Sequence, residues 1–307
     1  MQGDDGWTRL MKRGLFEEAW QICDRSIRLR RGRPQHHRPR HLQNIWDGSA
    51  LAQKRVLVRC YHGLGDTIQF TRYLPMVQRI AAETTVWIQP ALLELVRPSL
   101  RGIRLLPLHD GSPDVPFDVD IEIMELAHAF RTTTATIPAP VLRRFPIVKP
   151  PFGVAVVGLQ WRAGNWDRER SIPLPSIAPL LHLPGIRFVP LQERLTSSEQ
   201  EYFTLPADTD IIGVARTIAG CDLVISVDTM AAHLAGTLRI PTWTLLKHDA
   251  DWRWMSNRAD SPWYPTMRLY RQPAPHSWDA VIAEVRAELC TSLAHRTSLA
   301  VEGVGEE

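Results

Sequence analysis

The sequence has few cysteines, no long apolar run and little net charge, and each shortage removes a class of protein. Its four cysteines are far apart and lack Cys-x-x-Cys spacing, which argues against a metal centre and a disulfide framework and favours a reducing cytoplasm. No segment has the pattern of a signal peptide or approaches the length of a membrane-spanning helix. A net charge of +3 is too small to indicate nucleic-acid binding by itself.

What is present is typical of a globular α/β protein. The chain has 307 residues, of which 44% are apolar and 22% charged, enough for two domains of ordinary size. Its eleven tryptophans are a high count. We expect most of them in the core, and those in polar, glycine-containing stretches are candidates for stacking on a sugar or a base.

The most informative stretch is residues 223–236. An aliphatic run predicts a buried strand, which turns at Asp228 and Thr229 into a helix of small residues. Either residue is suited to cap that helix, and a strand tip that leads into a helix N-terminus is a common place for phosphates to bind. His233 lies one turn into the helix, where it either faces a bound anion or is a packed core histidine.

A similar strand, turn and helix occurs in the first half of the chain. Residues 55–61 predict a strand, and a Gly-x-Gly turn at Gly63 and Gly65 leads into a helix that Pro75 should break near Tyr73. The third glycine of the dinucleotide fingerprint is absent, which excludes an NAD site here. Asp66 is either a helix cap or a catalytic base at a strand tip.

The remaining segments alternate short strands and helices, and proline-rich residues 135–152 predict a boundary between two α/β domains. The other expected strands cover 85–89, 103–108, 119–123, 154–161, 187–191 and 242–246, and the other helices cover 92–100, 124–130, 177–183, 213–221 and 278–289. The predicted domains are residues 1–44, 45–150 and 151–290, followed by a flexible tail, 291–307.

The first 44 residues differ from the rest in composition and in their predicted secondary structure. Residues 7–31 predict one or two helices broken at Gly14. Residues 28–41 are basic and contain two prolines, and we interpret them as an exposed linker in preference to a nucleic-acid arm, because no aromatic residues are interleaved with the charges.

Four stretches together resemble glycosyltransferase family 9, which contains the ADP-heptose:lipopolysaccharide heptosyltransferases. Their sequences are most similar to those of members fused to tetratricopeptide repeats. The first is His62-Gly63-Leu64-Gly65-Asp66-Thr67-Ile68-Gln69-Phe70 with Arg72-Tyr73-Leu74-Pro75. The others are residues 158–161 with 170–174, residues 224–236, and residues 251–254 with 261–265. The order and spacing agree over about residues 45–290. Residues 7–30 are similar to half of a tetratricopeptide unit, which should pack on the body of the protein because one unit cannot bury its own face.

The resemblance implies a GT-B fold, in which two Rossmann-like α/β domains face a cleft, with the acceptor held by the N-terminal domain and the nucleotide sugar by the C-terminal one. It also implies inverting transfer of a sugar, without a metal or other cofactor, from a nucleoside-diphosphate donor (ADP-linked by preference) to a bacterial glycan or protein. Asp66 matches the family's base. The donor-binding residues implied are Arg170, Asp228, Thr229, Met230 and His233, and further candidates for the cleft are Gly63, Gly65, Gln69, Trp161, Asn165 and Trp252.

This sequence departs from the family in one loop. Residues 161–170 are shorter than in most repeat-fused relatives, and Arg170 stands where the heptosyltransferases have lysine, so it offers a bidentate fork in place of a point charge. The arginines of this loop form either a phosphate site or a solvated basic surface. Trp252 either stacks on the donor or plugs the space between the domains.

Two functions remain open from the sequence. One is a cytoplasmic glycosyltransferase, which is expected to bind no nucleic acid and to lie in the cytosol or at the inner face of the membrane. The other is a catalytically inactive relative that serves as a protein-interaction module.

Overall fold

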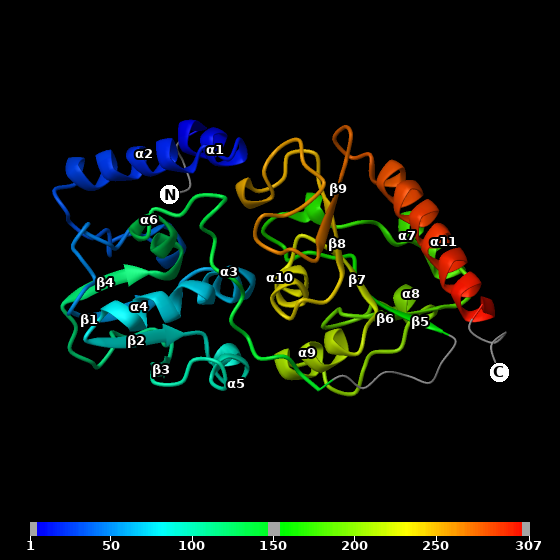
Figure 1. Ribbon diagram of the computed structural model, residues 1–307, viewed down its shortest axis with the longest axis horizontal. Helices are drawn as coiled ribbons and strands as arrows, with labels where there is room; N and C mark the ends of the chain where they lie inside the picture. Colours follow the sequence, from blue (N-terminus) through cyan, green and yellow to red (C-terminus); the bar gives the residue numbers. More distant parts are fainter. Residues whose placement is uncertain (1–4, 147–153, 303–307) are drawn as a thin grey trace.

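The chain folds into two α/β halves that lie side by side, each built on one parallel sheet (Figure 1). The computed structural model describes residues 5–146 and 154–302, with side chains as far as residue 291. Part of the predicted boundary at 135–152 therefore lies outside the described residues, as do the last residues of the predicted tail.

The first sheet has four strands in the order β3-β2-β1-β4. Their bounds are β1 (Arg55–Arg59), β2 (Glu83–Ile88), β3 (Arg104–Pro107) and β4 (Val119–Glu122). All pairs are parallel, and Val58 of the central strand lies opposite Val86 on one side and Ile121 on the other. A continuous run of aliphatic residues suits a strand that is buried on both faces, which is why this one takes the central place.

The helix after β1 is interrupted where the sequence predicts a break. It consists of α3 (Leu64–Phe70), a 3-10 turn over Thr71–Tyr73, and α4 (Leu74–Ile80). Pro75 occupies the first turn of α4, where its missing N–H has no intrahelical partner to lose. Two further short helices in this half are α5 (Leu93–Val96) and α6 (Leu126–Ala129).

The second sheet has five parallel strands in the order β6-β5-β7-β8-β9. Their bounds are β5 (Ala155–Gln160), β6 (Ile186–Pro190), β7 (Leu223–Val227), β8 (Thr242–Leu246) and β9 (Met267–Arg271). Strand β9 was not predicted. It follows a long irregular segment, and its polar arginines alternate with buried residues because it lies at the sheet edge.

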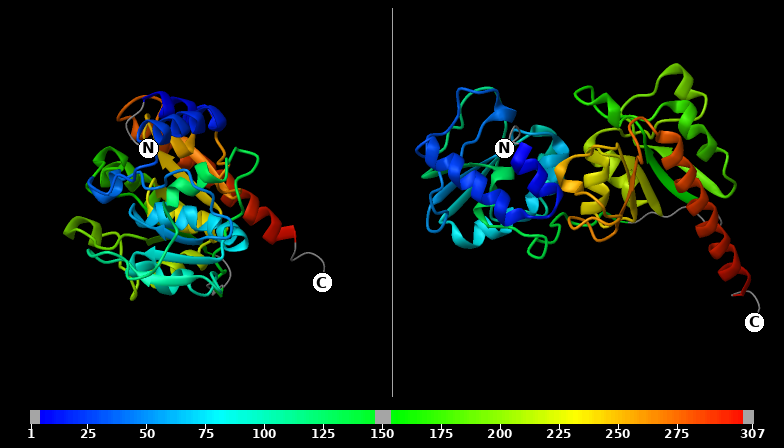
Figure 2. Two further views of the ribbon diagram at one scale, coloured as in Figure 1. Left: turned by 90° about the vertical axis from the view of Figure 1, so that its left-hand side faces the viewer. Right: turned by 90° about the horizontal axis from the view of Figure 1, so that it is seen from above.

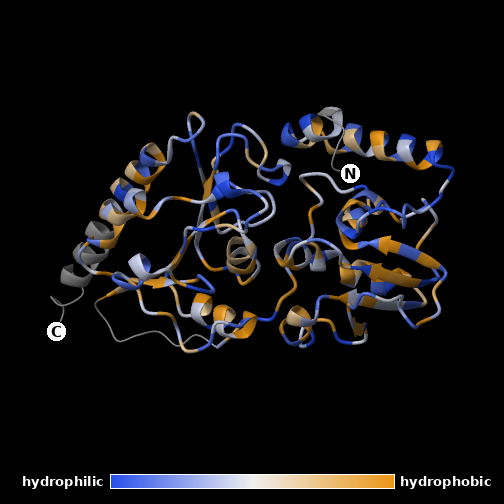
Figure 3. Cartoon of the chain, turned by 180° about the vertical axis from the view of Figure 1, so that it is seen from behind, coloured by the Kyte–Doolittle hydropathy of each residue, from blue (hydrophilic) through white to orange (hydrophobic). Residues whose placement is uncertain are grey.

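Helices cover both faces of the second sheet. Their bounds are α7 (Leu174–Leu181), α8 (Ser197–Gln200), α9 (Ile211–Ala219), α10 (Met230–Thr237) and α11 (Trp278–Glu302). Residues of α7 and α11 pack on one face, and residues of α9 and α10 on the other. Polar and apolar residues are mixed along the coloured part of α11 (Figure 3), and its apolar residues pack on the sheet.

The end of α11 corrects the prediction of a flexible tail from residue 291. The helix continues to Glu302, so most of that segment has a regular backbone, and residues 303–307 lie outside the described residues. None of the helices that the structure describes is both long and apolar enough to cross a membrane.

The N-terminal residues form a helical hairpin of α1 (Asp5–Lys12) and α2 (Phe16–Leu29), joined at Gly14 with φ of +76°. The hairpin touches both halves of the molecule (Figure 2). In the first half, Trp20 Nε1 donates a hydrogen bond of 2.7 Å to the carbonyl of Thr132. In the second half, the ring of Phe16 stacks on that of Trp263 at 6.3 Å. The expectation that this segment packs on the α/β body is thus confirmed.

The two halves are in direct contact through α3 and α10. A Cβ at Gly65 would lie 2.8 Å from the ring of His233 and 3.2 Å from Cα of Met230, so only glycine allows this approach. Arg72 adds a buried link, because its guanidinium donates to the carbonyl of Trp263 at 2.8 Å. One cluster of buried apolar side chains therefore continues from the first sheet into the second.

Candidate functional site

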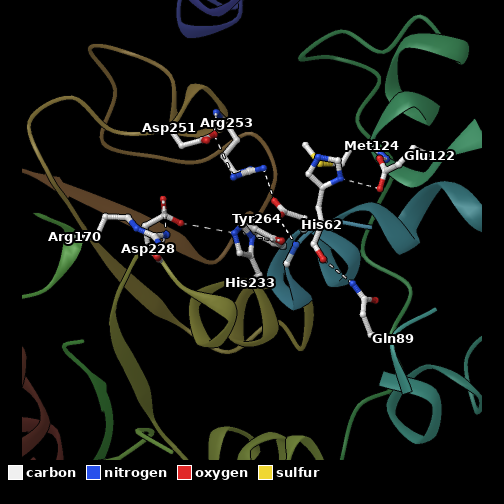
Figure 4. A network of polar contacts seen from close by, with 12 residues as sticks. His62, Gln89, Glu122, Met124, Arg170, Asp228, His233, Asp251, Arg253 and Tyr264 are labelled. Atoms are coloured by element: carbon white, nitrogen blue, oxygen red, sulfur yellow. Dashed lines mark hydrogen bonds and ion pairs between the residues drawn. The ribbon is translucent and has the colours of Figure 1, made fainter. Parts of the chain in front are cut away.

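The strand-to-helix turns that follow β1 and β7 lie against each other, since Gly65 of α3 contacts Met230 and His233 of α10. The groups around these two tips form a polar network that joins the halves (Figure 4). On the first tip, Asp66 lies in the first turn of α3 and accepts a hydrogen bond of 3.0 Å from the backbone N–H of Gly63. Its other oxygen accepts one of 2.6 Å from Arg253 of the second half. Asp66 is therefore a helix cap and also one partner of an ion pair between the halves.

The ion pair changes the acidity of Asp66. Burial alone would raise its pKa, but the guanidinium of Arg253, followed by His62 and His233, lowers it below its ordinary value. The carboxylate is ionised at neutral pH and is able to accept a proton. Its predicted role as a base requires Arg253 to give up part of its contact when an acceptor hydroxyl arrives.

Arg253, which the sequence did not assign, is the centre of positive charge in the site. It lies in a 3-10 turn, Trp252–Trp254, and is 7% exposed. Besides Asp66 it contacts Asp251 at 3.2 Å, and Asp228 is a third carboxylate close enough to raise its pKa. Its position in the Asp-Trp-Arg-Trp stretch, one of the four that resemble the family, could have marked Arg253 as a candidate site residue. Its pairing with Asp66 could not be found in this way, because the two residues are far apart in the sequence.

On the second tip, Thr229 occupies the N-cap position of α10 but makes no capping hydrogen bond with its side chain. Its hydroxyl instead lies 3.2 Å from that of Ser226. The first N–H groups of α10 thus lack a side-chain cap, which is the arrangement that receives an anion at a helix N-terminus. Met230, the next residue, is half-buried against Gly65 and so contributes to the contact between the halves.

Asp228 precedes this helix and is 6% exposed. Burial, with a contribution from Asp251, raises its pKa from 3.8 to about 6. Arg170 donates a hydrogen bond of 2.6 Å to the backbone carbonyl of Asp228, and its guanidinium lies 3.9 Å from the carboxylate. The structure therefore brings together these two predicted donor-site residues.

Of the two positions expected for His233, the structure shows that of a packed core histidine. It is 3% exposed, its ring stacks on Trp254 at 5.3 Å, and Nδ1 shares a hydrogen bond of 3.0 Å with the Tyr264 hydroxyl. Burial, followed by the charge of Arg253, lowers its pKa to about 3, so the ring is neutral at physiological pH. In this structure His233 lies in the contact between the halves, and its part in donor binding stays a prediction.

The loop that follows β5 presents a basic and aromatic surface. Trp161 is buried, stacks on Phe203 and donates to Glu199, so it belongs to the core and its assignment to the cleft is wrong. Asn165 is exposed. The guanidinium of Arg170 lies 4.2 Å from the ring centroid of Trp166, which is 76% exposed.

Lys247 is a further cation here that the sequence reasoning missed. It follows β8 and forms ion pairs of 3.0 Å with Asp167 and 3.2 Å with Glu169. Its place at the end of the strand next to β7 was a usable signal, since ligands of parallel sheets bind beyond the carboxyl ends of the strands.

The remaining residues that the sequence suggested for the cleft are caps or buried side chains. Gly63 is the residue before α3, whose N–H Asp66 caps. Gln69 is fully buried, and both polar atoms of its side chain lack a hydrogen-bond partner among the described residues. Trp252 is 5% exposed and contacts the ring of Trp7 edge-on at 5.3 Å, which supports the interpretation as a plug between the halves.

A cavity of about 240 Å³ lies beside this network, under the N-terminal segment. Its lining comes from the tips of β1 and β4, helix α1, the linker and the 3-10 turn of Arg253. It includes Trp7, Arg38, His41, Gln43, His62 and Trp252. The predicted linker is therefore part of a pocket wall. Among the described residues, no group of three or more His, Cys, Asp or Glu side chains is placed to hold a metal ion; metal independence stays a prediction.

Comparison with known proteins agrees with this arrangement. Residues 190–277 match the family model described as Glycosyltransferase family 9 (heptosyltransferase). This region runs from the end of β6 to the start of α11 and contains Asp228, His233 and Arg253. The link to repeat-fused members of that family stays a prediction.

A curated relative is Protein FlbA of Caulobacter vibrioides, which is 24% identical over 80% of this chain. The alignment covers 48% of that protein, so the chain spans about half the length of the relative it matches.

Two solved structures are similar in fold. The E. coli ADP-heptose lps heptosyltransferase II superposes with a TM-score of 0.54 and 14% identity, over 79% of this chain and 99% of that one. The glycosyl transferase family 9 protein from Veillonella parvula DSM 2008 gives 0.51 and 14%, over 73% and 87%. The expected fold, two Rossmann-like α/β halves of the GT-B type, is confirmed.

Proposed function

We propose that the chain transfers a sugar from a nucleoside-diphosphate donor to a glycan or protein acceptor. The observation that carries the proposal is the contact of Asp66, at the tip of the first sheet, with Arg253 of the second half. A proton acceptor and a group that binds phosphate charge thus meet at the point where the two strand-to-helix turns face each other. The family match over residues 190–277 supports the same reaction class.

The second half has the groups that a diphosphate requires. Arg170 and Arg253 supply guanidinium groups, and the start of α10 supplies N–H donors that no side chain caps. Both arginines are buried or nearly so, where the charge of a departing diphosphate is stabilised more than in water. An ADP-linked sugar is the donor we favour, because the heptosyltransferase that shares this fold is described as acting on ADP-heptose.

The first half supplies the base. The acceptor oxygen forms a bond to the anomeric carbon, the bond from that carbon to the phosphate oxygen breaks, and the hydroxyl proton goes to Asp66. Displacement from the face opposite the leaving group inverts the configuration at that carbon. A donor diphosphate competes with Asp66 for Arg253, and this exchange would free the carboxylate for its role.

Calorimetric titration with ADP, GDP and UDP tests the donor site. We expect ADP to bind in the micromolar range, about −8 kcal/mol. Arg170→Gln should weaken binding by about 1.5–3 kcal/mol, the value of a hydrogen bond to a charged group. His233→Ala should weaken it less, because the ring is neutral and closed off from solvent.

The control for Arg170→Gln is Arg187→Gln, an exposed arginine on β6. It should leave ADP binding unchanged. Failure of all three nucleotides to bind would contradict the transfer reaction. It would favour the alternative of an inactive interaction module, for which the closed contact of α3 with α10 is the supporting observation.

A further inference from the structure

We propose that the hairpin of α1 and α2 positions Arg253 by holding the turn that carries it, residues 252–256 (the Arg253 turn), and so sets the affinity of the site for a diphosphate. The inference rests on the proposed transfer, in which Arg253 supplies positive charge, and it concerns the regulation of that site. It gives a role to a segment that lies outside the two strand-to-helix turns.

The Arg253 turn has a backbone that needs support from its surroundings. Met255, two residues after Arg253, has φ of +49° and ψ of 174°. This region is nearly restricted to glycine, and holding another residue in it costs about 1–3 kcal/mol. Such a conformation persists only where neighbouring parts of the structure fix it. The neighbours of Met255 therefore show what keeps Arg253 in place.

One of these neighbours is the end of α1. The backbone N–H of Ser256 donates a hydrogen bond of 2.7 Å to the carbonyl of Lys12, the last residue of α1, which has no partner inside the helix. In the hairpin turn that follows, a Cβ at Gly14 would lie 3.8 Å from Met255 Sδ. On the other side, Arg271 of β9 donates to the carbonyl of Met255 at 2.6 Å. The strained residue is thus fixed between the hairpin and β9.

The start of the turn is covered by aromatic rings of the hairpin. Trp7 of α1 meets Trp252 edge-on at 5.3 Å. Trp252 meets Trp263 edge-on at 6.0 Å, and Phe16 of α2 stacks on Trp263 at 6.3 Å. None of these four rings is more than 5% exposed. The residue before Arg253 is therefore packed against hairpin side chains, and the residues after it against the hairpin backbone.

The hairpin is anchored on the half of the molecule that carries Asp66. Asp24 of α2 accepts hydrogen bonds of 2.9 and 3.1 Å from Arg131, which follows α6. Its carboxylate also lies 2.7 Å from His128 Nε2. Because α2 is fixed to the first half and α1 to the Arg253 turn, the hairpin keeps Arg253 within reach of Asp66.

Hydrogen exchange followed by NMR tests whether the hairpin holds the whole turn or only contacts its end. Trp254 and Met255 donate their N–H groups to carbonyls inside the turn or directly before it, at 3.2 and 3.1 Å. Ser256 donates to the hairpin. If the hairpin positions Arg253, loosening it should speed exchange at all three N–H groups. Faster exchange at Ser256 alone would overturn the inference, because the turn would then keep its shape without the hairpin.

A charge reversal at Lys12 loosens the hairpin from its exposed side. Its ammonium group donates to the carboxylate of Asp249, four residues before Arg253. Lys12→Glu should raise the exchange rates in the turn about fivefold, the effect of losing an exposed ion pair. Adding Asp249→Lys exchanges the two signs and should restore the wild-type rates. Arg9→Glu, the same charge change at an exposed position of α1, should have no effect.

Calorimetric titration with ADP measures the consequence for the site. Trp7→Ala removes the ring that covers Trp252 and should weaken ADP binding about tenfold, because only the fraction of molecules with the turn in place binds well. Trp7→Phe, which keeps an aromatic contact, should restore most of the affinity. The control is Trp278→Ala, which removes a buried tryptophan from the core cluster under α11 and should leave ADP binding unchanged.

The two measurements separate this inference from the proposed transfer. Equal ADP binding by Trp7→Ala and the wild type, or equal losses in Trp7→Ala and Trp278→Ala, would overturn the inference and leave the transfer standing. Faster exchange at Trp254 and Met255 in Lys12→Glu, in a protein that binds no nucleotide, would uphold the hairpin as the support of Arg253 and contradict the transfer.

Discussion

The two strand-to-helix turns of this protein have similar backbones and opposite chemistry. In the first, Asp66 caps the start of α3 with its own carboxylate. In the second, Thr229 leaves the start of α10 without a side-chain cap. One turn therefore presents a negative charge and the other presents N–H donors, and a GT-B fold places them face to face. The comparison shows how one local motif, used twice, presents a carboxylate at one turn and N–H donors without a side-chain cap at the other.

Arg253 is the residue that makes the two turns compatible, because it lies among Asp66, Asp228 and Asp251. Arg253→Met would leave these buried or half-buried carboxylates without their cation, and we expect a loss of about 3–5 kcal/mol in the free energy of unfolding. Urea denaturation at pH 7 measures it. Arg258→Met, which breaks an exposed pair with Asp260, is the control and should cost about 1 kcal/mol or less. Equal losses in the two variants would contradict this account of the interface.

The second turn should show an unusual dependence of stability on pH. The pKa of Asp228 is raised from 3.8 to about 6, so folding favours the protonated acid. The associated stability is complete below pH 3.8 and is lost as the pH rises through 6, by about 3 kcal/mol for about two pKa units. Asp228→Asn, which resembles the protonated form, should therefore be more stable than the wild type at pH 8, and the difference should shrink at pH 5.

Denaturation at the two pH values measures this effect. A second variant, for which we expect a stability change in the opposite direction, serves as the contrast. Arg55 lowers the pKa of Asp118 to about 2, so that carboxylate stabilises the fold when it is ionised. Asp118→Asn should lower stability at pH 8, the opposite direction to Asp228→Asn. An Asp228→Asn variant that is less stable than the wild type at pH 8 would show that burial does not dominate at this position.

The smallest expected effect concerns the missing cap. Because the Thr229 hydroxyl does not bond to the start of α10, Thr229→Ala should cost only a few tenths of a kcal/mol. Asp210, by contrast, caps α9 by accepting from Gly213 N–H at 2.7 Å, and Asp210→Ala should cost about 1 kcal/mol. Thermal unfolding of both variants compares them. A loss at Thr229 as large as that at Asp210 would mean that α10 is capped in solution.

Much of the fold was predictable because it depends on local signals. The aliphatic runs predicted the central strands, Gly14 predicted the turn of the hairpin, and Pro75 predicted the break at Tyr73. Strand β9 was missed since an edge strand shows a weaker apolar pattern than a central one. The positions of Asp66 and Asp228 in the two strand-to-helix turns followed from the same patterns, whereas Arg170 was assigned from the family resemblance.

The residues alone determined that two strand-to-helix turns exist and that each carries polar groups at its tip. Only the tertiary structure decided which groups meet: Arg253 pairs with Asp66, and Tyr264 and Trp254 contact His233. It also placed the linker in the wall of a pocket. The reason is physical. Helix and strand formation depends on neighbours within a few positions, whereas the ionisation of a side chain depends on burial and on charges that approach from distant parts of the chain. The neutral His233 and the raised pKa of Asp228 are both products of that burial.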